Sequence, residues 1–342
     1  MSVERKVKIA VLGTGRIGRV HIENISAHVK ELEIKTVADP FMTPEGEEFV
    51  RSCGVPCITK DVDSVFEDPQ IEAVLICTPS NIHADMIAKA AKAGKHIFCE
   101  KPVDHSVKRV KEALAIVREA GVKMQIGFNR RFDHNHRAVR DAVQSGKIGD
   151  PHILRISSRD PAPPTIEYVK SSGGIFYDMM IHDFDMIRFL AGCEATEVYA
   201  RGAVLIDPEI GEVGDVDTAV VTLTFENGAI GVIDNSRQAV YGYDQRIEVF
   251  GSGGSVKDEN DLPNTVVVTT ADQSACGTTY KVMWDRYTQA FIAEMKSFAD
   301  AILNDKTPEV TDLDGLYPVL MAAAALKSQK EGRPVKLSEV DE

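Results

Sequence analysis

The chain has 342 residues, of which 44% are hydrophobic and 27% are charged. These proportions are typical of globular proteins and exclude disordered and fibrous chains. The formal net charge is −13, and no run of Lys or Arg reverses it locally. Because such a charge repels phosphate backbones and anionic lipids, we expect neither a nucleic acid nor a membrane as a partner. The length exceeds what one core usually serves, so the sequence predicts two domains.

The opening residues and the cysteines both indicate a cytoplasmic protein. The segment MSVERKVKIAVLG holds no apolar stretch of the signal-peptide kind, and no segment of the chain approaches about 18 uninterrupted apolar residues. The six cysteines are scattered, several within apolar runs: Cys53, Cys57, Cys77, Cys99, Cys193 and Cys276. We therefore expect free thiols in a reducing compartment. Cys53 and Cys57 lie close together, but without a second pair or a neighbouring His they indicate a loop, and we predict no metal site.

Strand-like and helical patterns alternate in the first part of the chain. The strand-like runs cover residues 7–12, 33–39, 71–79, 96–100 and 122–128. Helical spacing covers 17–29, 81–93 and 106–120, and the last two stretches are followed by Gly94 and Gly121. Glycine readily takes the left-handed conformation that ends helices. The alternation predicts an α/β Rossmann domain, a doubly wound parallel sheet, over residues 1–128.

The pattern changes after residue 128. Strand-like runs follow one another at 152–158, 197–205, 216–225, 229–236, 246–251 and 264–270, with Asn227-Gly228 marking a hairpin turn. Two helical stretches, about 286–304 and 312–330, end the chain. We expect residues 129–342 to form an α+β domain with a large, mainly antiparallel, open-faced sheet that binds substrate and mediates oligomerisation. We expect the last helix to pack back on the first domain.

A glycine-rich turn lies between the first strand and the first helix. Residues 13–18 read GTGRIG, a G-x-G-x-x-G pattern. The first glycine makes the tight turn, the second lets the backbone approach a pyrophosphate, and the third allows close packing of helix on strand. The predicted dinucleotide contacts here are Gly13, Gly15, Arg16, Ile17 and Gly18. The motif alone would also suit FAD, and a substrate site with its own acid and base is what favours a nicotinamide.

Asp39 narrows the choice of cofactor. It ends the second strand, 21 residues after Gly18, where a carboxylate can accept hydrogen bonds from both hydroxyls of an adenosine ribose. A 2′-phosphate would be repelled, and the residues that follow offer no Arg to neutralise it, so NAD is favoured over NADP. Arg16 is the one residue that could weaken this preference for NAD over NADP. The alternative is that Asp39 only caps a turn.

A base is needed wherever a hydride leaves an alcohol without a metal, because the hydroxyl proton must be removed. The segment 171–192 reads as one apolar helix entered through Gly173-Gly174, with Asp178, His182 and Asp185 at i, i+4 and i+7. These side chains share a face, so Asp178 can orient His182 as a base. From spacing alone an ordinary helix ion pair is favoured over catalysis, and the two-histidine spacing of metallohydrolases is missing.

Lys101 follows a parallel strand, at the edge where ligands of open α/β sheets gather. We assign it to the substrate hydroxyl and the nicotinamide ribose. The alternative is a solvated lysine at a strand end.

Five stretches together carry a recognisable pattern: GTGRIG, the segment from Thr78-Pro79 to His83, FCEKP at 98–102, GFNRRFD at 127–133 and SGGIFYDMMIHDFDM at 172–186. With them the chain resembles the Gfo/Idh/MocA oxidoreductases over nearly its whole length. The stretches 153–164 and 240–251 look most like those of the family's inositol 2-dehydrogenases.

That resemblance implies NAD-dependent oxidation of myo-inositol at its axial hydroxyl to the 2-keto product, in inositol catabolism. It implies a catalytic set of Lys101, Asp178 and His182, and it outweighs the ion-pair reading. It further suggests that the polyol contacts Arg131, Asp160, Asp185 and Tyr243, besides the catalytic set. It suggests that Thr78, Asn81, His83 and Glu100 line the dinucleotide near its nicotinamide end, with Lys101.

The resemblance also leaves alternatives open. Some inositol dehydrogenases have Asn where this chain has Asp160, so a scyllo-inositol dehydrogenase or another cyclitol or aldose dehydrogenase is an alternative. A different class is a redox sensor that binds NAD without catalysis. Family members are commonly tetramers built on the exposed face of the second sheet, so we expect a homotetramer.

Overall fold

The computed structural model describes residues 5–341, and residues 1–4 and 342, which the predicted domain bounds include, lie outside them. The chain forms two compact units. Unit 1 comprises the residues up to Phe132 together with residues 288–319. Unit 2 comprises residues 133–287 and the segment from residue 320. The predicted domains were continuous, whereas residues 288–319 belong to unit 1.

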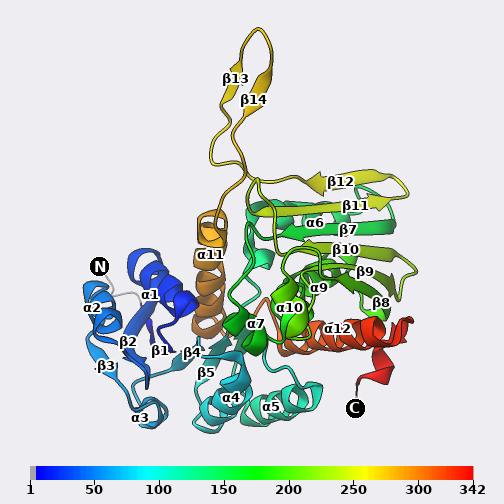
Figure 1. The fold of residues 1–342 in the computed structure, drawn as a ribbon. Helices are drawn as coiled ribbons and strands as arrows, with labels where there is room; N and C mark the ends of the chain where they lie inside the picture. The colour runs from blue at the N-terminus through cyan, green and yellow to red at the C-terminus, as the bar shows by residue number, and fades with distance from the viewer. Residues whose placement is uncertain (1–4, 342) are drawn as a thin grey trace. The chain divides into compact units, whose positions relative to one another are not determined.

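Unit 1 is built on a parallel sheet of six strands in the order β3-β2-β1-β4-β5-β6 (Figure 1). The strands are β1 (Val7–Leu12), β2 (Leu32–Ala38), β3 (Cys57–Thr59), β4 (Ala73–Ile76), β5 (His96–Cys99) and β6 (Met124–Ile126). This order confirms the predicted Rossmann sheet. The prediction of a loop at Cys57 was wrong, because Cys57 begins β3, an edge strand only three residues long and mostly half-exposed.

The helices of unit 1 lie on both faces of this sheet. They are α1 (Arg16–His28), α2 (Pro44–Ser52), α3 (Asp63–Glu67), α4 (His83–Lys92) and α5 (Val107–Ala120), with short 3₁₀ turns at Ser80–Ile82 and Asn129–Phe132. The helix α11 (Met283–Leu303) belongs to unit 1 from residue 288. Apolar residues of α1 and α11 share one core with β1, β2 and β4. As predicted, α5 ends at a left-handed Gly121, and its first turn is capped by Ser106.

Unit 2 is built on a mixed sheet in the order β12-β11-β7-β10-β9-β8-β15 (Figure 1). The strands are β7 (Pro151–Arg159), β8 (Ala195–Ala203), β9 (Thr218–Phe225), β10 (Ile230–Ser236), β11 (Asp244–Gly251), β12 (Gly254–Asp258) and β15 (Val335–Lys336). Neighbours are antiparallel except β7 and β10, which are parallel. The predicted antiparallel character is therefore confirmed in the main, and Gly228 takes the positive φ of 85° that the β9–β10 hairpin requires.

Helices cover one face of the second sheet. Unit 2 contains α6 (His134–Gln144), α7 (Ile166–Ser172), α8 (Gly174–Asp178), α9 (Ile181–Ala191), α10 (Pro208–Glu212), a 3₁₀ turn (Leu337–Glu339) and α12 (Asp312–Glu331) from residue 320. The helix α9 packs so closely on the sheet that a Cβ at Gly231 would lie 2.8 Å from the Ile187 side chain. The other face exposes Val220, Ile230 and Phe250. That face is open, as the alternation in β9 predicts.

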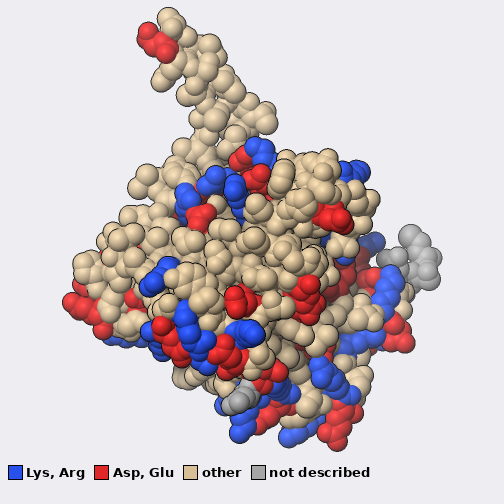
Figure 2. Space-filling model, turned by 90° about the vertical axis from the view of Figure 1, so that its right-hand side faces the viewer, with Lys and Arg blue, Asp and Glu red and all other residues tan. Residues whose placement is uncertain are grey.

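The valine run at 264–270 does not join this sheet, so its assignment to it was wrong. It forms a separate hairpin of β13 (Val267–Thr269) and β14 (Ser274–Cys276). Val266, Val267 and Val268 are exposed there, and in Figure 2 the projecting segment is mostly uncharged with acidic atoms near its tip. Elsewhere in that view acidic and basic side chains are interspersed. Among residues 5–341, no helix combines the length and the apolar character that a membrane crossing needs.

Candidate active site

The glycine turn is shaped to receive an anion. Gly13 has a φ of +97°, and a Cβ there would lie 2.7 Å from the Cys77 carbonyl oxygen. A Cβ at Gly18 would lie 2.2 Å from the Gly13 oxygen, whereas one at Gly15 would meet nothing within 4 Å. Gly15 is also the N-cap of α1 and supplies no side-chain cap to its first turn. Backbone N–H groups and the helix dipole thus face an open space, which fits the pyrophosphate of a dinucleotide.

Asp39 is held by the same turn. Its Oδ2 accepts from the Thr14 backbone N–H at 2.8 Å and from the Thr14 hydroxyl at 2.5 Å, and its Oδ1 accepts from the Phe41 N–H at 2.9 Å. A carboxylate has about four acceptor sites, so one is left for a ribose hydroxyl. Asp39 therefore fixes a turn and also retains capacity for one of the two predicted ribose hydrogen bonds.

His83 contacts two backbone segments at the carboxyl edge of the parallel sheet. Its ring is buried, with Nδ1 2.7 Å from the Pro102 oxygen and Nε2 2.8 Å from the Thr78 oxygen. Burial lowers the pKa of His83, although both carbonyls act in the opposite direction. The ring thus links the end of β4 to the cis Lys101-Pro102 segment after β5. Contact between His83 and the dinucleotide stays a prediction.

The other predicted residues of unit 1 differ in surroundings. Thr78 and Lys101 are half-buried at the carboxyl ends of β4 and β5, and Asn81 is exposed in the following 3₁₀ turn. Glu100 is buried, with Oε1 2.7 Å from His21 Nε2. Arg131 is buried too, and its Nη2 donates to Asp314 at 2.7 Å. Four of these residues, Thr78, Asn81, Glu100 and Lys101, therefore follow β4 or β5 at the edge where open α/β sheets bind ligands.

The predicted single helix over 171–192 is wrong, because the structure breaks it. Gly173 and Gly174 have φ of 86° and 80°, α8 ends at Asp178, and α9 begins at Ile181. Asp178 and His182 thus lie on consecutive helices rather than on one regular face. Both are half-buried.

Asp178 is held by two residues that sequence reasoning missed. Its Oδ1 accepts from the Tyr168 hydroxyl at 2.8 Å, and its Oδ2 lies 3.4 Å from Arg237 Nη1. Arg237 is only 1% exposed and also lies 3.4 Å from Asp215 Oδ2. An isolated Arg after a strand carries no sequence signal, since the neighbours that bury it are 22 and 59 residues away. The structure therefore adds a buried cation beside the predicted catalytic carboxylate.

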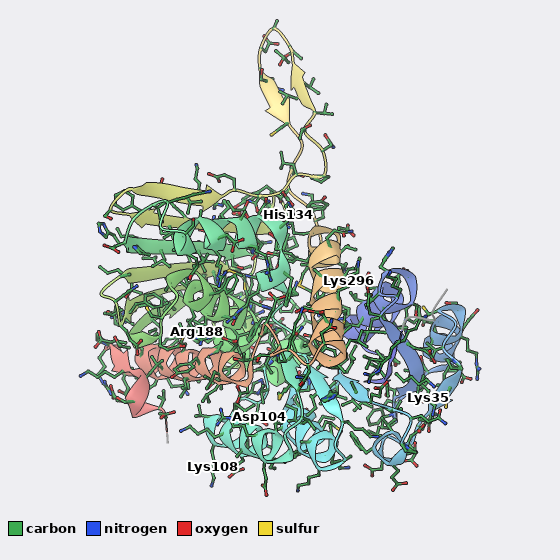
Figure 3. All side chains as sticks on the ribbon, turned by 180° about the vertical axis from the view of Figure 1, so that it is seen from behind. Lys35, Asp104, Lys108, His134, Arg188 and Lys296 are labelled. Carbon is green, nitrogen blue, oxygen red and sulfur yellow. The ribbon has the colours of Figure 1, made fainter. Side chains whose placement is uncertain are left out.

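The predicted polyol contacts of unit 2 fall into two groups. Asp160 follows β7 and Tyr243 precedes β11, and because Arg159 pairs with Asp244 these residues lie at the same end of adjacent strands. Arg237 follows β10 at that end, since Ser236 also pairs with Arg159. Asp185, by contrast, is buried on α9 with Oδ1 3.9 Å from Arg188, which pairs with Glu194 at 2.5 and 2.6 Å (Figure 3 labels Arg188).

Comparison with known proteins places this geometry in a family. The family model described as the oxidoreductase family with an NAD-binding Rossmann fold matches residues 7–128, and the GFO/IDH/MocA C-terminal domain matches 136–257. The chain is 47% identical to the oxidoreductase YrbE of Bacillus subtilis and 46% identical to a myo-inositol 2-dehydrogenase of Thermotoga maritima, over 98% of this chain in both cases and 98% and 99% of theirs.

A solved structure agrees with these matches. The scyllo-inositol dehydrogenase of Lactobacillus casei, with bound NAD(H) and scyllo-inositol, superposes with a TM-score of 0.91 at 30% identity, covering 98% of this chain and 100% of that one. The chain belongs to the GFO/IDH/MocA family of NAD-binding oxidoreductases.

Proposed function

We propose that this protein is an NAD-dependent inositol 2-dehydrogenase, which oxidises the axial hydroxyl of myo-inositol to the 2-keto product. The observation that carries the proposal is the 46% identity, over the full chain, to a myo-inositol 2-dehydrogenase. The presence of Lys101, Asp178 and His182 supports it, because an alcohol oxidised without a metal needs a base and a donor for the reacting oxygen.

The residues divide the work in the following way. NAD, when bound, supplies the acceptor for the hydride that leaves C2. His182 takes the hydroxyl proton, so that the C–H electron pair leaves as hydride and the oxygen becomes a ketone. Lys101 donates a hydrogen bond to that oxygen as its charge develops. Asp178 orients the imidazole of His182, and Tyr168 and Arg237 hold Asp178 in turn.

The remaining predicted side chains select and seat the two ligands. In the proposal Asp160 and Tyr243 bind hydroxyls of the polyol, with Arg131 and Asp185 closing the set. Thr78, Asn81, His83 and Glu100 surround the nicotinamide end of the dinucleotide, and Asp39 binds the adenosine ribose. The open acceptor site of Asp39 supports the preference for NAD.

A second candidate is oxidation of scyllo-inositol. The 30% identity to a scyllo-inositol dehydrogenase favours it. Asp160 bears on the choice of stereoisomer, because a carboxylate and an amide offer different hydrogen bonds to a hydroxyl. A third candidate, an NAD-binding sensor without catalysis, is disfavoured because Lys101 and His182 are both present.

We also propose a setting and an assembly. All six cysteines are free thiols, which supports a reducing compartment such as the cytoplasm. The exposed apolar side chains of Val220, Ile230 and Phe250 support a homotetramer formed through the open face of the second sheet. Inositol catabolism is the process that such an enzyme would serve.

The experiment is a panel of inositol stereoisomers and aldoses assayed with NAD⁺ by the absorbance of NADH. We expect the highest kcat/KM with myo-inositol and a loss of at least about a hundredfold in His182→Ala. A higher kcat/KM with scyllo-inositol would transfer the proposal to the second candidate. Binding of NAD⁺ without turnover of any of these compounds would favour the sensor.

A further inference from the structure

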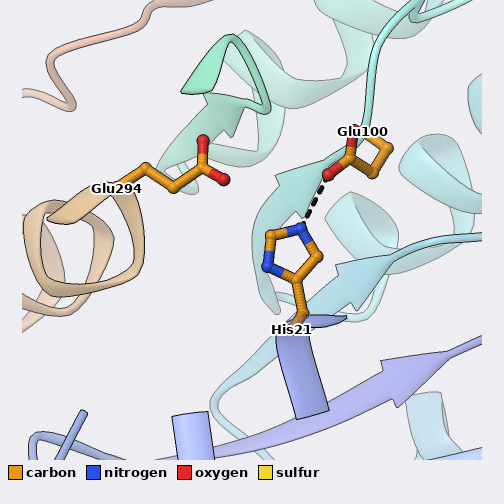
Figure 4. A group of neighbouring side chains, drawn as sticks. All are labelled: His21, Glu100 and Glu294. Carbon is orange, nitrogen blue, oxygen red and sulfur yellow. Dashed lines mark hydrogen bonds and ion pairs between the residues drawn. The ribbon is translucent and has the colours of Figure 1, made fainter. Parts of the chain in front are cut away.

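A buried group of three titratable side chains lies inside unit 1, and one of them, Glu100, directly precedes Lys101 in the chain. His21 comes from α1, Glu100 follows β5 and Glu294 comes from α11 (Figure 4). All three are buried, and one ligand-type atom from each lies within 4.8 Å of the others. Within this group, the one hydrogen bond between the described side chains joins His21 Nε2 and Glu100 Oε1, at 2.7 Å.

The three side chains leave polar atoms unsatisfied. Among the described residues, His21 Nδ1 and both carboxyl oxygens of Glu294 have no hydrogen-bond partner. Figure 4 shows the Glu294 carboxyl turned toward His21 and Glu100. An unpaired carboxylate in a protein interior is costly, and a second carboxylate beside it adds repulsion. Two ionised glutamates with a neutral imidazole would give the cluster a charge of −2.

Within residues 5–341, no Lys or Arg pairs with the Glu294 carboxyl. The thiols of Cys77, just after β4, and Cys99, at the end of β5, are buried, and burial together with the Glu100 charge raises the pKa of both. Gln125 contributes its amide, but Nε2 donates to the Glu294 backbone oxygen at 2.9 Å. A proton on the cluster is therefore the simplest way to lower its charge.

We propose that Glu294 is a buried carboxylic acid whose proton reduces the charge of the cluster, and that Glu294 and His21 are positioning residues for Glu100 and the adjoining Lys101. His21 donates from Nε2 to the Glu100 carboxylate, and the cluster carries a single negative charge. Burial first, and the Glu100 charge second, raise the pKa of Glu294 well above its usual range. This inference rests on the proposed role of Lys101.

The packing of His21 explains how the protonation state of Glu294, on α11, can affect the position of Glu100, after β5. The His21 ring meets Phe98 and Phe291 edge-on, with centroids 5.3 and 5.7 Å away, so its orientation is fixed by packing. On the other side, a Cβ at Gly127 would lie 3.1 Å from the Glu100 carboxyl. The carboxylate therefore lies between backbone and imidazole, and it precedes Lys101 directly in the chain.

A divalent cation is the rival occupant, because one imidazole and two carboxylates are also metal ligands. Ligands about 2.0–2.2 Å from a shared tetrahedral ion lie roughly 3.3 Å apart. The 2.7 Å separation of His21 Nε2 and Glu100 Oε1 is shorter and is that of a direct hydrogen bond. The observed spacing favours the proton.

The first test is spectroscopic and uses the whole enzyme without substrate. We expect the infrared spectrum of wild type at pH 8 to contain the carbonyl stretch of a protonated carboxylic acid, and Glu294→Gln to remove one such band from it. Absence of the band in wild type would overturn the proposal. A melting temperature that rises with added Mn²⁺ or Zn²⁺ in wild type but not in Glu294→Gln would also overturn it.

The second test is kinetic. Gln is neutral like the protonated acid and keeps its shape and polarity beside His21, so Glu294→Gln should keep kcat within about twofold of wild type. Glu294→Leu, and His21→Phe with its retained ring packing, should lose kcat about tenfold at nearly unchanged KM for polyol. Equal losses in Glu294→Gln and Glu294→Leu would contradict positioning by a proton. An infrared band in a chain that oxidises no cyclitol would separate this inference from a failure of the proposed function.

Discussion

Arg237 is the residue that most changes the picture of the site drawn from sequence. It is buried, and it lies 3.4 Å from the carboxylates of both Asp178 and Asp215. Removing one member of a buried charge network leaves the others uncompensated. The proposed orientation of His182 by Asp178 thus depends on a cation outside the recognised motif.

Replacing Arg237 should impair the reaction more than a surface change would. We expect Arg237→Met to lower kcat/KM for myo-inositol by about a hundredfold, because the Asp178 carboxylate loses its fixed position. Arg51→Met, at an exposed arginine of unit 1, is the control and should stay within about twofold of wild type. Steady-state kinetics measure both, and equal effects would remove Arg237 from the site.

Asp39 should govern the choice of cofactor. We expect Asp39→Ala to raise KM for NAD⁺ by about tenfold or more, since the acceptor for a ribose hydroxyl is lost and the Thr14 bonds are broken. Asp39→Asn keeps one acceptor oxygen for Thr14 and should lose less. The ratio of kcat/KM for NAD⁺ to that for NADP⁺ is the measurement, and an unchanged ratio in Asp39→Ala would show that the carboxylate serves only the turn.

At the scale of elements, the paired glycines at the start of α8 show how backbone conformation and a nearby carboxylate are linked. Gly174 has a φ of 80°, and a Cβ there would lie 2.7 Å from Asp215 Oδ1, which accepts from the Ile175 N–H. Gly146 has a similar φ of 73° but nothing within 4 Å. The two positions separate backbone strain from steric conflict.

Gly174→Ala should therefore destabilise the protein more than Gly146→Ala. Left-handed backbone costs an alanine about 1–2 kcal/mol at either position. At Gly174 the approach to Asp215 adds to this, and we expect a lower midpoint of denaturant unfolding for that variant. Identical midpoints would mean that Asp215 moves away from the added methyl group without a loss in the free energy of unfolding.

A second group of acids joins α6, β12 and the start of α11 within unit 2. Arg286 Nη1 lies 2.5 Å from Asp133 Oδ2, and His136 Nε2 lies 3.3 Å from Asp258 Oδ2. Asp261 also pairs with Arg286 and with His134, which Figure 3 labels. Burial, with the charges of Asp133 and Asp261, raises the pKa of Asp258 to about 7 despite Arg286.

Because of Asp258, the free energy of unfolding should decrease as pH rises. Its folded pKa of about 7 exceeds the ordinary 3.8, so the native state holds more protons than the unfolded state between these values. Stability is then present at acid pH and is lost as pH rises from about 4 to 7. We expect Asp258→Asn to be more stable than wild type by roughly 2–4 kcal/mol at pH 8 and similar to it near pH 4. Unfolding curves at both values, with exposed Glu259→Gln as control, measure this, and a difference independent of pH would contradict it.

The elements also show how far sequence reasoning reaches. The strand 7–12, the helix end at Gly121 and the hairpin at Gly228 were predicted because burial period and glycine conformation are local properties. β3 and β12 were missed because both are short and largely exposed edges. The break between α8 and α9 lies at Met179–Met180, where no Pro or Gly marks it. Long-range pairing, as of Arg237 with Asp178, leaves no local pattern at all.

At the scale of the whole molecule, the open face of the second sheet is the surface that the homotetramer proposal uses. Val220 is 45% exposed and Ile230 is 51% exposed on that face. Side chains of this kind are usually covered in an assembly.

Charging this face should dissociate the assembly. We expect wild type to run as a tetramer and Val220→Glu with Ile230→Lys to run as smaller species, because buried unpaired charges oppose association. Phe41→Glu, at an exposed apolar residue of unit 1, should leave the mass unchanged. Light scattering after size exclusion measures the mass, and a monomeric wild type would refute the tetramer.

The proposed reaction transfers the C2 hydrogen of myo-inositol to NAD as hydride. Myo-inositol that carries deuterium only at C2 tests this transfer, with the label in the reduced dinucleotide determined by mass spectrometry. We expect one deuterium in the reduced nicotinamide and a 2-keto product without label. Unlabelled NADH with deuterium retained in the product would place the oxidation at another carbon and contradict the proposed reaction.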